Sequence, residues 1–221
     1  MLGARMKASP PAPAVSAADP ARLPPVVLVH GIFRSQRDMR RLRKIFEAAG
    51  RRTLAPSLKP CDGSAPLHEL AAQLAAFVAD NLAPGEQCDL VGHSMGALVA
   101  RAYIQRHGGR ERTRRFVTLA APHHGSLLAW CWPGRGARDL RPGSPFLRDL
   151  ARDAYSLDGE LVASVWTPFD VIILPARSSE MPVGRNLRWP LPHHRSFITS
   201  RTFARSLVQL LGADPLPKTK I

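Results

Sequence analysis

The chain has 221 residues, 45% of them hydrophobic, which suits one domain of ordinary size with a substantial core. Its formal net charge is +14, but neither interleaved aromatic residues nor zinc-finger spacing accompanies the arginines, so the sequence does not favour nucleic acid as a partner. The three cysteines, Cys61, Cys88 and Cys131, are scattered and odd in number, which argues against a disulfide framework and favours a reducing compartment.

Both ends of the chain are predicted to be tails around one domain. Residues 1–24 are rich in Ala and Pro and lack the continuous apolar run of a secretory signal. Residues 213–221 have no helical or strand pattern, and no run of 18 apolar residues predicts a membrane span. We therefore expect a single domain over residues 25–212 and a cytoplasmic location.

Apolar runs and helical stretches alternate through the first half of this domain. The predicted strands are residues 26–30, 51–56, 87–92 and 115–122. The predicted helices between them are residues 35–49, 66–82 and 95–107. A repeated strand–helix order is typical of the α/β class, in which helices cover both faces of a mostly parallel sheet.

The alternation breaks after the fourth strand and then resumes. Residues 123–158 are rich in Gly, Pro and Arg, which indicates an excursion over the sheet. Strand character returns at residues 161–166, and residues 186–191 are a weaker strand candidate. Residues 196–212 are predicted to form the final helix.

The stretch LVGHSMGALVA, Leu90–Ala100, places Ser94 between two glycines where a strand runs directly into a helix. Gly92 and Gly96 leave room for a sharp turn and for close helix–strand packing. Such a turn projects a serine hydroxyl above the sheet and is called a nucleophile elbow. The alternative is a glycine-rich turn without chemistry.

A nucleophilic serine needs a histidine as base and an acid that orients the base, and in this architecture they follow in the order serine, acid, histidine. Asp170 follows the strand at 161–166 by a short loop, where the acid belongs, although it could instead be a turn residue or a helix cap. His193 and His194 lie between the last strand candidate and the last helix, so one of them is the expected base. His93 is expected to point away from Ser94.

The oxyanion of an acyl-transfer intermediate needs two backbone donors. One is the N–H of Met95, which follows Ser94 at a helix start. The other is predicted to be the N–H of Ile32, because Gly31 before it permits close approach of the backbone.

Several segments together resemble bacterial lipases and esterases of the α/β-hydrolase superfamily. VVLVHGIF is similar to the family's oxyanion loop, LVGHSMGALVAR to its elbow, and LAAPHHGS to its G-T-P-H-x-G-S stretch, with Ala120 and Ala121 in place of Gly-Thr. FDVIILPARSS resembles the segment of the acid. HHRSFITS resembles that of the base and aligns His194 with it. The resemblance also implies that His123 is structural. A metal role for His123 and His124 is not favoured, because no third ligand is apparent, and no cofactor is expected.

Residues 126–150 are predicted to cover an acyl pocket as a cap or lid. The residues expected to line it are Leu127, Leu128, Trp130, Trp132 and Phe146. Gly134, Gly136 and Gly143 would permit movement, and Arg135, Arg138, Arg141 and Arg148 would face anionic lipid. The alternative is a rigid loop whose tryptophans fill the core.

The sequence thus predicts a serine hydrolase that cleaves carboxylic esters of small molecules or lipids through an acyl-enzyme. An acyltransferase with the same three residues is one alternative. A non-catalytic binding protein of this fold, in weak contact with an anionic membrane surface, is another.

Overall fold

The computed structural model describes residues 23–157 and 159–212. Most of the predicted N-terminal tail and all of the predicted C-terminal tail lie outside these residues. Within the described ranges, no helix has both the length and the apolar character needed to cross a membrane.

Six parallel strands form one sheet in the order β2-β1-β3-β4-β5-β6. Their bounds are β1 Val26–Val29, β2 Thr53–Leu54, β3 Cys88–His93, β4 Thr113–Leu119, β5 Val162–Trp166 and β6 Arg185–Arg188. The predicted parallel sheet is therefore confirmed, and the weak strand candidate near residue 186 forms the β6 edge. Because all strands run the same way, their carboxyl ends meet at one edge, where ligands gather in open α/β sheets.

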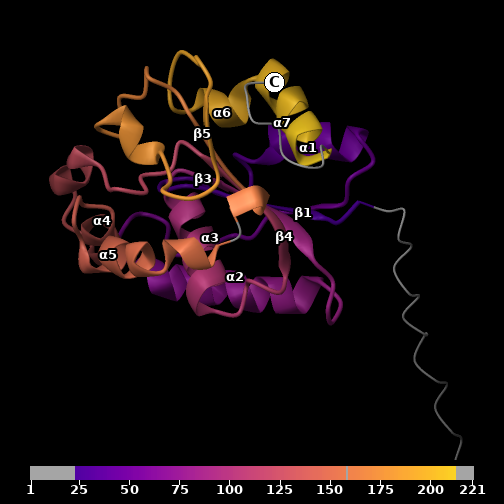
Figure 1. Ribbon diagram of the computed structural model, residues 1–221, viewed down its shortest axis with the longest axis horizontal. Coiled ribbons are helices and arrows are strands. Elements are labelled where there is room, and N and C mark those ends of the chain that lie inside the picture. Colours follow the sequence, from indigo (N-terminus) through magenta and orange to yellow (C-terminus); the bar gives the residue numbers. More distant parts are fainter. Residues whose placement is uncertain (1–22, 158, 213–221) are drawn as a thin grey trace, which may run out of the picture.

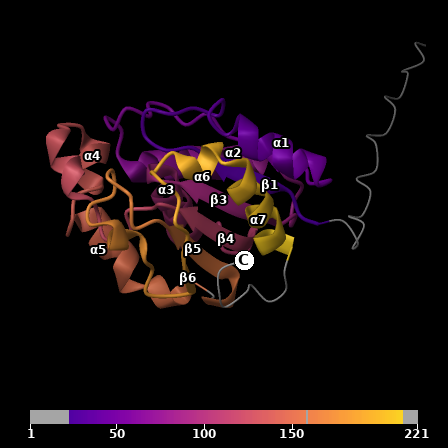
Figure 2. The ribbon, with the colours of Figure 1, turned by 90° about the horizontal axis from the view of Figure 1, so that it is seen from above.

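Helices cover both faces of the sheet (Figures 1 and 2). Those with α-helical hydrogen bonding are α1 Arg40–Ala48, α2 Leu67–Asn81, α3 Met95–Arg106, α4 Arg135–Asp139, α5 Pro145–Arg152, α6 Ser196–Thr199 and α7 Arg201–Gly212. The short 3-10 turns are η1 Leu127–Cys131, η2 Ala154–Ser156, η3 Gly159–Leu161 and η4 Ala176–Ser179. One face carries α1, α6 and α7, and the other carries α2, α3 and α5.

Two helix predictions need correction. The first helix begins at Arg40 and not at residue 35, because Asp38 accepts hydrogen bonds from the backbone N–H and the hydroxyl of Ser35 and holds the preceding residues in a turn. The final helix is broken at Ser200, whose hydroxyl oxygen accepts a hydrogen bond from the N–H of Phe203 and so begins a second helix.

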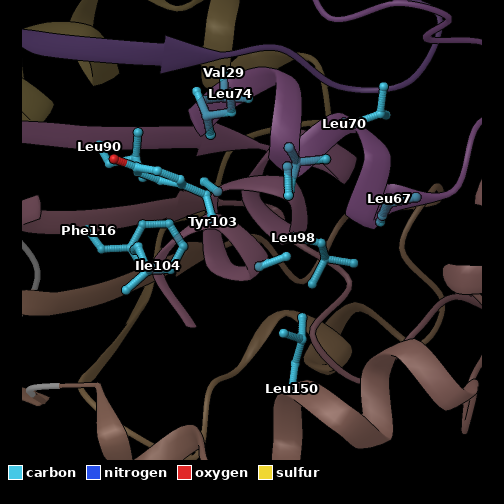
Figure 3. Close-up of a cluster of buried hydrophobic side chains, with 14 of the residues drawn as sticks. Val29, Leu67, Leu70, Leu74, Leu90, Leu98, Tyr103, Ile104, Phe116 and Leu150 are labelled. Atoms are coloured by element: carbon cyan, nitrogen blue, oxygen red, sulfur yellow. The ribbon is translucent and has the colours of Figure 1, made fainter. Parts of the chain in front are cut away.

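Alternate strand residues point to opposite sides and supply two apolar cores. Toward α2, α3 and α5 they include Val29, Leu90 and Phe116, which pack with Leu67, Leu70, Leu74, Leu98, Tyr103, Ile104 and Leu150 (Figure 3). Toward α1, α6 and α7 they include Leu28, Val91, Val117 and Val165. Burial on both faces explains why the strands are almost uniformly apolar, and it makes the sheet a rigid base for the loops at its edge.

Candidate active site

Ser94 lies between β3 and α3 in a backbone conformation that non-glycine residues rarely adopt, with φ 55° and ψ −128°. Such a conformation costs on the order of 1–3 kcal/mol and persists only where the surroundings enforce it. A Cβ on Gly92 would lie 2.4 Å from Cα of Ala97, and one on Gly96 would lie 2.2 Å from the carbonyl oxygen of His30. Both glycines are therefore required by close packing, as the elbow motif predicts.

The loop after β1 lies directly against this elbow. A Cβ on Gly31 would be 3.0 Å from Cβ of Ser94. Buried His30 fixes the loop, because its Nδ1–H donates to the carbonyl of Gly31 at 3.0 Å and its Nε2 accepts the N–H of Leu58 at 3.2 Å. Burial lowers the pKa of His30, in keeping with this neutral ring. The two predicted oxyanion donors, Ile32 and Met95, thus belong to segments that meet at Ser94.

Asp170 and His194 are brought together by the loops that follow β5 and β6. The Nδ1–H of His194 donates to Oδ2 of Asp170 at 2.7 Å. The other oxygen, Oδ1, accepts the N–H groups of Ile172 and Ile173, both at 2.9 Å. The carboxylate is buried and held at both oxygens, so its orientation is fixed. Asp170 thus contacts the histidine and also holds the turn of its own loop, while its catalytic role stays a prediction.

The two neighbouring histidines have different surroundings. His193 is exposed, and its ring bonds to the hydroxyl of Ser196 three residues later, at 3.0 Å from Nδ1. His194 is half-buried, and its ring contacts Asp170 on one side and His93, the residue before Ser94, on another. The structure therefore pairs His194 with the acid, in agreement with its alignment in the resembling segment.

The contact between His93 and His194 was not foreseen from the sequence. The two ring centroids are 4.7 Å apart, and the Nε2–H of His93 donates to the backbone oxygen of His194 at 3.3 Å. Burial, together with the charge of His194, places the pKa of His93 well below its ordinary value, so this ring stays neutral. Since His93 directly precedes Ser94, the contact joins the base segment to the elbow.

The strand periodicity could have suggested this contact. His93 shares its face of β3 with Val91, and that face packs against the helices that follow the base segment.

His123 has the structural surroundings that the family resemblance implies. It is buried, its Nε2–H donates to the hydroxyl of Thr118 at 3.1 Å, and its Nδ1 lies 3.5 Å from a nitrogen of Arg101. Burial, the largest effect, and the nearby charge of Arg101 lower its pKa well below the ordinary value. Across residues 23–157 and 159–212, no group of three or more His, Cys, Asp or Glu side chains could hold a metal ion.

The predicted cap is an ordered excursion tied down at several points. The hydroxyl of Ser126 donates to the carbonyl of Ile172 at 2.7 Å and accepts the N–H of Leu174 at 3.0 Å, which binds the start of the excursion to the loop of Asp170. A Cβ on Gly134 would lie 2.0 Å from the carbonyl oxygen of Gly63.

The expectation that glycines make the cap movable needs correction at two positions. Gly136 packs like Gly134, since a Cβ there would lie 2.1 Å from the carbonyl oxygen of Ala65. These two glycines serve close packing. Gly143, with a φ of +70° and open space around it, is the remaining candidate hinge among the three.

The tryptophans of the excursion do not fill the core, so that alternative is wrong. Trp130 is 60% exposed and Trp132 is 46% exposed. The guanidinium of Arg141 lies 4.4 Å from the Trp130 ring, and the ring of Trp132 meets that of Phe33 at 5.1 Å. Phe146 differs from the prediction, because it is half-buried against the core on the α2 and α3 face.

Exposed apolar side chains gather at the carboxyl edge of the sheet, in the loops that follow β1, β4 and β5. We call this set the apolar rim; it consists of Phe33, Leu127, Leu128, Trp130, Trp132, Phe169, Val171 and Ile172. The three strands border or neighbour β3, which ends at Ser94. Exposed apolar patches on proteins are typical of binding sites for apolar ligands or lipid surfaces.

Solved structures with the same fold are hydrolases of several kinds. Bacillus licheniformis lipase BlEst2 in its mature form has a TM-score of 0.72 and 20% identity, over 89% of this chain and 95% of that one. An extracellular alpha/beta-hydrolase from a Paenibacillus species has a TM-score of 0.59 and 16% identity, over 87% and 98%. The thioesterase domain from the curacin biosynthetic pathway has a TM-score of 0.63 and 15% identity, over 85% and 90%. The predicted α/β-hydrolase fold is thereby confirmed.

Sequence comparison assigns the family. No curated protein sequence matches the chain. Residues 25–152 match the family described as palmitoyl protein thioesterase, a range that includes Ser94 and the loop after β1 but ends before Asp170 and His194. Since this match extends over more than half of the chain, the protein belongs to the palmitoyl protein thioesterase family.

Proposed function

We propose that the protein is a serine hydrolase that cleaves carboxylic esters or thioesters of apolar acyl groups. The observation that carries the proposal is the strained elbow of Ser94 beside a histidine that is hydrogen-bonded at 2.7 Å to a buried carboxylate. Membership of a thioesterase family and the lipase and thioesterase neighbours support ester hydrolysis as the reaction class.

The acylation step follows from this arrangement. The Ser94 hydroxyl attacks the acyl carbon while Nε2 of His194 takes the hydroxyl proton. Asp170 holds Nδ1–H of the ring and stabilises the imidazolium. The backbone N–H groups of Ile32 and Met95 stabilise the oxyanion of the tetrahedral intermediate. His194 then gives its proton to the leaving alcohol or thiol, and the acyl group remains on Ser94.

Deacylation uses the same groups in reverse. Water attacks the acyl-enzyme, His194 takes its proton and returns it to the oxygen of Ser94, and the carboxylic acid is released. An alcohol or thiol in place of water would give acyl transfer. The products formed in the presence of added alcohol distinguish the two reactions.

The apolar rim supports an apolar acyl group as the part of the substrate that the protein holds. Its tryptophans and leucines follow β4, the strand that borders β3, and offer apolar area to an acyl chain near the end of β3, where Ser94 lies. Arg135 and Arg138 of α4 are exposed beside the rim, which supports a weak contact with an anionic membrane surface when the acyl chain belongs to a lipid.

The test is Ser94→Ala, assayed with a fluorophosphonate probe and with p-nitrophenyl esters and thioesters of increasing acyl length. We expect loss of labelling and a rate lower by on the order of 10⁴ or more, because the oxyanion donors alone then remain. Ser64→Ala is the matched control, since Ser64 is exposed and bonds only within its own turn to Asp62. Equal labelling and rates in the two variants would contradict the mechanism.

A further inference from the structure

A cationic cavity lies beside the candidate active site, on the other face of the sheet from the excursion. Its volume is about 650 Å³. The elements around it are the turn before α1, α1 itself, and the junction of α6 with α7, which pack side by side over one face (Figure 2). Six basic residues line it: Arg37, Arg40, Arg41, Lys44, Arg195 and Arg201.

The positive charge of this cavity is largely uncompensated. Its one acidic residue, Asp38, is engaged by the N–H and hydroxyl of Ser35 and by Arg34 at 3.7 Å. Arg41 donates to the carbonyl of Thr199 at 2.6 Å. Within the described ranges, the other five basic side chains form no ion pair and no hydrogen bond; they are Arg37, Arg40, Lys44, Arg195 and Arg201. Five donor-rich cations around one cavity favour a multiply charged anion.

The lining residues connect this cavity to the chemistry at Ser94. Arg195 directly follows His194, and Ser35 is three residues after Ile32. The cavity is thus built by the chain segments that leave the base and the oxyanion loop. Arg34 lies between Ile32 and Ser35 in the sequence. Its charge lowers the pKa of His93, although burial of that ring has the larger effect.

The reaction places the departing part of the substrate near the base. The base donates its proton to the leaving group, so the leaving group lies on the side of His194. The apolar rim lies on the loops after β1, β4 and β5, where an acyl chain would be held. The cationic cavity borders the region near the base, because its lining residue Arg195 directly follows His194.

We propose that this cavity binds phosphate groups carried by the leaving alcohol or thiol of the substrate, an inference that rests on the proposed hydrolase function. Guanidinium groups match phosphate oxygens in charge and in bidentate geometry, and five of the six basic residues are arginines. A cavity of about 650 Å³ holds a small molecule. The phosphate belongs either to a nucleotide-bearing thiol or to a glycerophosphate headgroup.

The kinetic test compares substrates that share one acyl group. Butanoyl coenzyme A, butanoyl glycerophosphate and the uncharged butanoyl thioester of N-acetylcysteamine all remain dispersed in water, so no lipid interface contributes. The variant is Arg40→Gln with Lys44→Gln, which removes two exposed cations on one side of α1 without breaking a contact. The matched control is Arg43→Gln with Arg52→Gln, which removes two exposed cations that pair with Glu47 and Glu86 outside the cavity.

The expected result is a lower preference for the phosphorylated substrate. In the cavity variant, kcat/KM for that substrate relative to the uncharged thioester should fall on the order of tenfold, and the control should keep the native ratio. If the relative kcat/KM falls for the coenzyme A thioester, the phosphate that the cavity binds belongs to a nucleotide-bearing thiol. If it falls for the glycerophosphate ester, the phosphate belongs to a glycerophosphate headgroup. An unchanged ratio for both substrates overturns the proposal.

A binding measurement separates this proposal from the proposed reaction. Inorganic pyrophosphate should raise the melting temperature of the Ser94→Ala protein, which has no hydrolase activity to interfere, and the rise should shrink when the Arg40 and Lys44 changes are added. If the native protein hydrolyses no ester but this shift is present, the hydrolase proposal fails and the phosphate site stands. A shift equal in the cavity variant and in the control overturns the site.

Discussion

Replacing Asp170 by Asn tests the orientation of the candidate base with almost no change in volume. Oδ1 of Asp170 accepts two backbone N–H groups at 2.9 Å, and Oδ2 faces Nδ1 of His194 at 2.7 Å. In Asp170→Asn, the two N–H donors select the amide orientation that leaves oxygen at the Oδ1 position. The amide nitrogen then faces His194 and donates to Nδ1.

That donation places the ring proton of His194 on Nε2, the nitrogen that must accept the proton of Ser94. The wrong tautomer in another serine hydrolase triad lowers kcat by about 10⁴, which corresponds to about 5.4 kcal/mol of transition-state stabilisation. We expect a loss of that order in kcat for p-nitrophenyl butanoate. The melting temperature should change little, because the amide oxygen still accepts both backbone N–H groups.

The control is Asp149→Asn, which removes a charge from an exposed pair with Arg106 in the excursion. Such a pair contributes about 1 kcal/mol or less, so activity should be unchanged. A native kcat in Asp170→Asn, with the protein folded, would refute the argument from tautomers. It would leave Asp170 as a turn residue that holds the loop after β5.

Two further predictions concern the base and the apolar rim. His194→Ala should lose activity on the order of 10⁴-fold, because it removes the group that moves the proton. His193→Ala should keep most of its activity. If ester kinetics show the two phenotypes exchanged, the assignment of the base is contradicted. Trp130→Ala and Trp132→Ala should shift the preferred acyl length in a p-nitrophenyl ester series. Because Trp130 is 60% exposed, its truncation should cost less than about 2.5 kcal/mol on unfolding in denaturant, from roughly 100 Å² of buried area. Lower stability with an unchanged acyl-length profile would argue against a substrate role.

Sequence reasoning succeeds where local pattern and fold demand the same residue. The elbow is such a case, because Gly92 and Gly96 are needed both by the turn and by the packing of α3 on β1 and β3. The order of strands and helices follows from apolar periodicity in the same way. Asp170 lies in the loop after β5, where the order of acid and base in this architecture predicts the acid.

Contacts between distant segments could not be predicted, because no local pattern encodes them. His93 and His194 are 101 positions apart and meet only once the loop after β6 folds over β3. The cationic cavity combines residues 35–45 with residues 195–201, and in the sequence these arginines look like ordinary solvated helix faces. The exposure of Trp130 and Trp132 likewise depends on how the excursion is anchored at Ser126 and α4.

The distribution of backbone strain gives a separate argument for chemistry at this edge of the sheet. In the part of the chain that the structure describes, the non-glycine residues with positive φ are Phe33, Ser94 and Ala120. They lie just past the carboxyl ends of β1, β3 and β4, three consecutive strands of the sheet. A turn that served only to connect elements could use glycine at these positions and avoid the cost. Ala120 even occupies the place of a glycine in the resembling lipase segment, and its N–H is still bonded to the carbonyl of Val165 at 2.9 Å. Strain of this kind persists only where the surrounding structure enforces it, and here it is centred on Ser94, next to His93, whose ring meets that of the paired His194.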